Sequence, residues 1–196
     1  MTIIDDNPIS WERMIGAVED VQRRLERAVR ALEAAGVPYA ICGGQAVAAW
    51  VSKIDRAAVR TTVDVDVLLR REDFPAAKSA LEHSGFVHRH VRGVTMFLDG
   101  DAGRPREAVH VVFANEKVRS EYLESSPDVS ERLPGPPFDV LELAALLRMK
   151  LTSFRDKDRT HVRDMLEVGL IDDTWIASLP RVLGDRLRRL IDTPEG

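Results

Sequence analysis

Residues 60–69 read Arg-Thr-Thr-Val-Asp-Val-Asp-Val-Leu-Leu, an apolar run that two carboxylates interrupt. Its β-branched residues predict a strand over residues 63–69. Side chains two apart in a strand share a face, so Asp64 and Asp66 point to one side and the valines to the other. Neighbouring carboxylates repel each other, and one divalent cation would relieve that repulsion. Two interpretations stay open: a metal site, or the wet outer face of an edge strand.

A glycine pair, Gly43-Gly44, separates an expected strand at residues 37–42 from an expected helix at residues 45–51. Glycine permits a sharp turn and lets a ligand approach the backbone closely. The free N–H groups at the start of the following helix favour an anion such as phosphate. Alone, such a pair is more often an ordinary turn between a strand and a helix.

The glycine pair and the Asp-x-Asp strand, preceded by Arg60-x-Thr62, together resemble the signature of the DNA polymerase beta-like nucleotidyltransferase superfamily. The chain looks most similar to its small bacterial members, several of which are toxins or antitoxins. The likeness covers residues 37–113. It implies an α+β fold with a mixed β-sheet core, flanking helices and a C-terminal helical bundle. It also implies Mg²⁺-dependent transfer of a nucleoside monophosphate from a nucleoside triphosphate to a hydroxyl.

The resemblance implies roles for individual residues as well. Asp64 and Asp66 would hold the metal ions and act in catalysis, while Gly43 and Gly44 would hold phosphate oxygens. Three further residues are assigned to nucleotide binding: Arg60, Thr62 and Lys150. Lys150 belongs to a basic run at residues 148–164, which is also typical of a solvated helix face held by ion pairs.

The sequence departs from the family pattern at the third carboxylate. The family carries this residue on a later strand between apolar residues, and the best match, residues 108–113, has His110 there. An imidazole brings no negative charge and suits Mn²⁺ better than Mg²⁺, which prefers oxygen ligands. It can also act as a catalytic base, since its reference pKa is about 6.5. Two functions stay open: an altered transferase, or a non-catalytic nucleotide-binding regulator or antitoxin-like protein of the same fold.

The remaining elements follow from hydrophobic periodicity. Residues 10–35 predict a long helix with Ser10 as its N-cap, suited to a sheet face or to a short coiled-coil seam. The other expected elements are a helix at 73–83, strands at 86–90, 95–98 and 108–113, and helices at 139–151, 159–168 and 180–191. Residues 125–137 hold four prolines and predict a linker between a core at 1–125 and a helical subdomain at 138–196.

Composition narrows the class of protein. A formal net charge of −4 gives no general attraction to nucleic acid. One cysteine, Cys42, excludes an internal disulfide and fits a reducing compartment. No stretch is typical of a membrane span, and residues 1–8 lack the apolar core of a signal peptide. We therefore expect a cytoplasmic protein that binds no membrane, and the resemblance implies a nucleoside triphosphate as its partner. RNA, a protein or a small molecule as acceptor, and a partner protein, stay open.

Overall fold

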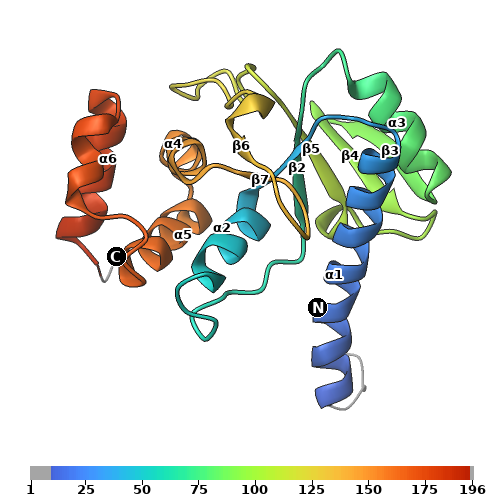
Figure 1. The fold of residues 1–196 in the computed structure, drawn as a ribbon, viewed down its shortest axis with the longest axis horizontal. Helices are drawn as coiled ribbons and strands as arrows, with labels where there is room; N and C mark the ends of the chain where they lie inside the picture. The colour runs from blue at the N-terminus through green and yellow to red at the C-terminus, as the bar shows by residue number, and fades with distance from the viewer. Residues whose placement is uncertain (1–9, 195–196) are drawn as a thin grey trace, which may run out of the picture.

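A seven-stranded mixed sheet runs through the computed structural model, which describes residues 10–194 (Figure 1). Its strand order is β3-β4-β5-β2-β1-β7-β6. The strands are β1 (Ala40–Cys42), β2 (Val65–Leu69), β3 (Phe86–Val91), β4 (Val94–Asp99), β5 (Val109–Phe113), β6 (Arg132–Leu133) and β7 (Val140–Leu141). The helices are α1 (Trp11–Ala34), α2 (Gly43–Ser52), α3 (Phe74–His83), α4 (Leu143–Ser153), α5 (Asp156–Glu167) and α6 (Arg181–Asp192). The predicted α+β class with a mixed sheet is confirmed, whereas the expectation about residues 1–8 lies outside the described part.

The two faces of the sheet are covered by different helices (Figure 1). Helices α1 and α3 pack on one face, against Val65 and Val67 of β2. Helices α2, α4, α5 and α6 form the second core, to which Leu68 of the same strand belongs. The alternation of β2 therefore divides the protein into two cores. Asp64 and Asp66 belong to the second face.

Helix α1 begins as predicted but is only half covered. The Ser10 side chain caps it by accepting a hydrogen bond of 3.3 Å from the Arg13 N–H. The stretch from Val21 to Leu32 packs on the sheet, whereas the first turns project beyond it (Figure 1). Met14 and Val18, which the periodicity placed in the packing stripe, are therefore exposed. The sheet-packing interpretation is confirmed for the second half of the helix only.

The prediction of helices alone after residue 138 is wrong, because Val140–Leu141 forms β7. This strand pairs in parallel with β1, and the Ile41 N–H donates to the Asp139 carbonyl at 2.8 Å. Glu142 rather than Asp139 is consequently the N-cap of α4. A segment of two apolar residues is too short to show the alternation of a strand. This strand forms because the edge of β1 is free to pair with it.

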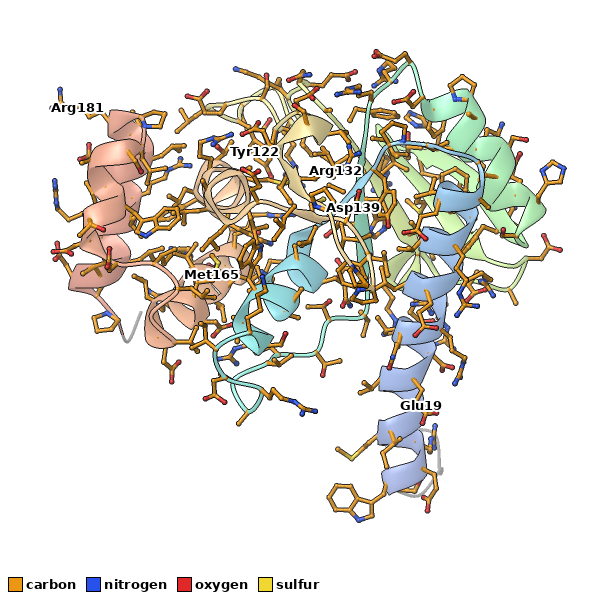
Figure 2. The ribbon with its side chains drawn as sticks, viewed as in Figure 1. Glu19, Tyr122, Arg132, Asp139, Met165 and Arg181 are labelled. Carbon is orange, nitrogen blue, oxygen red and sulfur yellow. The ribbon has the colours of Figure 1, made fainter. Side chains whose placement is uncertain are left out.

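The expected linker at residues 125–137 also contributes to the sheet. Its last part forms β6, which pairs antiparallel with β7. Arg132 and Asp139 lie close together here (Figure 2), with Arg132 Nε 2.7 Å from an Asp139 carboxylate oxygen. Because one sheet takes strands from both segments, the division at 125–138 stays a prediction. No helix within residues 10–194 has the length and apolar character needed to cross a membrane.

Helix α5 carries a buried histidine whose protonation opposes folding. His161 is 9% exposed, and burial, followed by the positive charge of Lys150, lowers its pKa to about 4. A lowered pKa in the folded state means that the unfolded chain binds the proton more tightly. The stability contributed by neutral His161 is thus complete above pH ~6.5 and is lost as the pH falls toward 4.

We expect the protein to lose about 2 kcal/mol of unfolding free energy at this residue between pH 7 and pH 5, where the proton binds the unfolded chain preferentially. In His161→Gln that loss should be absent, as measured by urea unfolding at both pH values. His83→Gln, at an exposed position of α3, serves as the control and should behave like the parent. Equal losses in the parent and in His161→Gln would contradict the assignment.

Candidate metal and nucleotide site

Asp64, Asp66 and His110 meet on one face of the sheet. The parallel pairing of β2 and β5 places Asp66 opposite His110, and Asp64 directly precedes β2. One ligand atom from each residue lies within 4.8 Å of the other two. The structure thus brings together the three residues that the sequence assigned to catalysis, although His110 is more than forty residues from the two aspartates.

Gly43 packs directly against this cluster. Antiparallel pairing of β1 with β2 places Cys42 opposite Asp66, so the chain turns across the Asp66 carboxylate at the next residue. Gly43 has φ +64°, and a Cβ atom there would overlap that carboxylate. A Cβ on Gly44 would likewise overlap the Thr62 side chain. Both glycines are therefore required by protein contacts, and they form the first turn of α2 rather than a loop before it.

A cavity of about 590 Å³ opens over the cluster. Its walls come from the sheet, the β3–β4 hairpin, the segment after β5, and the α4–α5 corner. Among its lining residues are Gly43, Asp64, Asp66, Arg92, Val94, Met96, His110, Arg119, Tyr122, Lys150, Arg155 and Lys157. Tyr122 lies on the α4 side of the molecule (Figure 2). This volume is in the range of pockets that hold cofactors and small ligands.

Asp66 is partly buried beside a second carboxylate, that of Asp64. Burial, and then the neighbouring charge of Asp64, raises the pKa of the Asp66 carboxyl, while Lys150, His110 and Lys157 oppose this shift. A raised pKa shows that the ionised carboxylate lacks sufficient positive partners in the protein alone. A divalent cation among the three ligand atoms would supply that charge. Two carboxylates and an imidazole therefore form a donor set that fits such an ion.

Lys150 lies deep in the cavity wall. Its ammonium is 3.2 Å from an Asp158 oxygen, and the two side chains are 4% and 1% exposed. Asp158 also accepts hydrogen bonds from Ser153 Oγ at 2.8 Å and Arg155 Nε at 2.7 Å. Burial raises the pKa of Asp158, but Arg155, Lys150 and Ser153 outweigh it and lower the pKa to about 2. Lys150 thus joins α4 to α5, and its contact with nucleotide stays a prediction.

Arg60 and Thr62 lie in the segment that leads into β2, away from the cavity. Arg60 Nε is 2.8 Å from the Asp164 carboxylate, which fastens this segment to α5. Thr62 Oγ1 accepts a hydrogen bond of 2.9 Å from Gln45 Nε2. Within residues 10–194, neither side chain belongs to the lining of the cavity. Their predicted part in nucleotide binding stays a prediction, and the structure gives each a contact inside the protein.

Lys157 and Arg155 line the cavity although neither was among the predicted site residues. Lys157 Nζ lies 3.4 Å from an Asp64 carboxylate oxygen, and it reaches there because α5 begins at Asp156, three residues before the predicted start. Phe154, in the left-handed conformation with φ +49°, ends α4 and redirects the chain. Asp158 accepts from the Arg155 backbone N–H at 3.3 Å, as the acidic half of a capping box does. The three-residue spacing between Arg155 and Asp158 was therefore the sequence signal that could have located the start of α5.

Comparison with protein families gives one result. The family model described as uncharacterised nucleotidyltransferase matches residues 15–144. The matched range contains the glycine turn, both aspartates and His110. No curated protein matches the sequence.

Solved structures share the fold at low sequence identity. A nucleotidyltransferase-like antigen from Paracoccidioides brasiliensis is 17% identical with TM-score 0.55, covering 89% of this chain and 88% of its own. A putative nucleotidyltransferase from H. pylori is 13% identical with TM-score 0.51, covering 95% of this chain and 80% of its own. ANT(2″)-Ia in complex with adenylyl-2″-tobramycin is 13% identical with TM-score 0.51, covering 91% of this chain and 99% of its own. At these identities the likeness shows the fold alone.

Gly36 and Gly43 have the same backbone conformation, so comparing them separates the cost of backbone strain from the cost of a steric clash. Gly36 has φ +63° with nothing within 4 Å of a built Cβ, whereas Gly43 has φ +64° and Asp66 in the way. We expect Gly36→Ala to lower the unfolding free energy by about 1 kcal/mol and Gly43→Ala by about 3 kcal/mol in urea unfolding. Adding Asp66→Ala to Gly43→Ala should recover most of the difference. Equal losses at the two glycines would show that Asp66 does not press on Gly43.

Two lysines of the cavity differ in burial and offer a matched pair. Lys150→Met leaves Asp158 with less compensation in a buried position, so we expect a loss of about 3 kcal/mol in unfolding free energy. Lys157 is 50% exposed, so Lys157→Met should cost less than about 1 kcal/mol. Urea unfolding at neutral pH measures both. A fully stable Lys150→Met protein with weakened triphosphate affinity would instead favour direct contact of Lys150 with nucleotide.

Proposed function

The chain belongs to the family described as uncharacterised nucleotidyltransferases, and we propose that it moves a nucleoside monophosphate from a nucleoside triphosphate to a hydroxyl acceptor. The observation that carries this proposal is the cluster of Asp64, Asp66 and His110. The cluster lies in the cavity between a glycine turn on one side and a hairpin wall on the other. Both substrates of a transfer reaction can therefore approach it.

The nucleotide end of the cavity is the end next to Gly43. A divalent cation held by Asp64, Asp66 and His110 would supply positive charge to phosphate oxygens there. The first turn of α2 offers backbone N–H groups, which suit an anion. Lys157 and Arg155 line the facing wall with side chains about half exposed, and each can reach a phosphate oxygen. Lys150 adds its charge from within the wall, since it opposes the raised pKa of Asp66.

The acceptor end lies on the opposite side of the cluster. Met96 of β4 is opposite His110 of β5, so the sheet continues outward from His110 away from Gly43. Arg92 and Val94 at the hairpin extend this wall. With the triphosphate at one end and the hydroxyl at the other, the attacking and leaving oxygens can align. The acceptor oxygen bonds to the α-phosphorus, pyrophosphate leaves and the hydroxyl proton is released.

Incubation with α-labelled nucleoside triphosphates, a divalent metal, and total cellular RNA and protein tests the proposal. We expect a labelled acceptor and released pyrophosphate. Asp64→Asn and Asp66→Asn should each lower the rate on the order of a hundredfold, because charge on the phosphates is no longer compensated. Asp101→Asn, at an exposed turn, is the control and should match the parent.

Transfer that survives both aspartate substitutions would contradict the proposal. Nucleotide binding without any labelled product, with RNA, protein and small hydroxyl compounds all supplied, would favour the non-catalytic regulator. A toxin or antitoxin role is part of the proposal only where the labelled acceptor is a cellular RNA or protein.

A further inference from the structure

The orientation of the His110 ring is set by a backbone carbonyl. His110 Nε2 lies 3.0 Å from the Pro105 oxygen. A carbonyl oxygen can only accept, so Nε2 carries the proton and donates it. Pro105 opens a short 3-10 turn, Pro105–Glu107, whose following residue Ala108 also donates to the same oxygen at 3.4 Å. The carbonyl is thereby held in place by local backbone structure.

In the neutral ring this leaves Nδ1 without a proton and turned toward the carboxylates. Nδ1 is 3.8 Å from an Asp66 oxygen, and an Asp64 oxygen completes the group within 4.8 Å. Three lone-pair acceptors thus face one another with no hydrogen to share. Lys157 contacts one of the three groups from an exposed position, with its Nζ 3.4 Å from an Asp64 carboxylate oxygen. A divalent metal ion would satisfy all three acceptors together.

The distances are compatible with ligation through Nδ1. Ligands at bond lengths of about 2.1 Å around one ion are separated from one another by roughly 3 to 3.5 Å. The separation of 3.8 Å between Nδ1 and Asp66 closes to this value with a small side-chain rotation. Metal-bound histidines ordinarily donate their second ring N–H to a carbonyl or carboxylate, which fixes the tautomer. Pro105 provides that partner here.

We propose that Asp64, Asp66 and His110 Nδ1 form a site that selects a nitrogen-accepting first-row divalent ion, represented by Mn²⁺, over Mg²⁺. Mg²⁺ requires oxygen ligands in octahedral geometry and gives up its water reluctantly. Mn²⁺ and the later first-row ions accept imidazole, and their affinity for mixed nitrogen and oxygen sites is higher. With two carboxylates instead of three, the site also offers Mg²⁺ less negative charge. The inference rests on the metal site of the proposed function, but not on transfer itself.

A titration of the protein with Mn²⁺ in the absence of nucleotide tests the inference. The EPR signal of the free ion measures how much Mn²⁺ is bound. We expect one Mn²⁺ to bind through the cluster, and Mg²⁺ to displace it only at an excess of about a hundredfold or more. His110→Ala should weaken Mn²⁺ binding by at least about tenfold. His110→Asp should keep binding Mn²⁺ but let Mg²⁺ compete at least about tenfold more effectively, since all three ligands are then carboxylates. His83→Ala, far from the cluster on α3, is the matched control.

Three results would overturn the inference: no Mn²⁺ binding by the folded parent, displacement by equimolar Mg²⁺, or unchanged Mn²⁺ affinity in a folded His110→Ala protein. Circular dichroism of each variant establishes folding before the titration. Selective Mn²⁺ binding without nucleotide transfer would refute the proposed function and leave this inference standing. Transfer that runs equally well on Mg²⁺, with metal affinity independent of His110, would do the opposite.

Discussion

The parallel pairing of β2 with β5 is the constraint on which the site depends. It fixes Asp66 opposite His110, while the antiparallel pairing of β2 with β1 fixes Cys42 opposite the same aspartate. The chain must then turn across a carboxylate at Gly43, where a Cβ has no room. A shift of one residue between β2 and β5 would send Asp66 into the apolar core beneath α1 and α3. The strand pairing that builds the cluster is therefore the same pairing that keeps the core of the fold apolar.

The helical half of the molecule brings positive charge to the carboxylates of the sheet. The buried pair of Lys150 and Asp158 holds α4 and α5 at a fixed corner. From that corner the first turn of α5 brings Lys157 to Asp64, and Arg60 fastens the strand segment to Asp164 further along the same helix. Buried ion pairs contribute little net stability, but they specify one arrangement when one partner cannot be left alone. Here that arrangement faces the cations of α5 toward the carboxylates.

The predictability of each part follows the range of the interaction that determines it. Alternation along β2 and the cap at Ser10 are local, so the strand that carries Asp66 and the start of α1 could be predicted, whereas the fold class was predicted from the resemblance of the motifs to a known superfamily. His110 was identified because it occupies the position at which the family carries its third carboxylate, on a strand between apolar neighbours. Strand β7 depends on a partner edge formed a hundred residues earlier, and the burial of Lys150 depends on how α4 and α5 pack. No local pattern carries either of those facts, so neither the burial of Lys150 nor the contact of Lys157 with Asp64 could be predicted from the sequence.

We propose that this face of the sheet holds a metal ion beside a nucleotide-binding turn. Crystals soaked with MnCl₂ and a non-hydrolysable nucleoside triphosphate, with anomalous diffraction measured at the manganese absorption edge, test it most directly. The account predicts an anomalous peak in contact with Asp64, Asp66 and His110 Nδ1, with triphosphate density between that peak and Gly43. A manganese peak held by other residues, or triphosphate bound with no metal at the cluster, would contradict it.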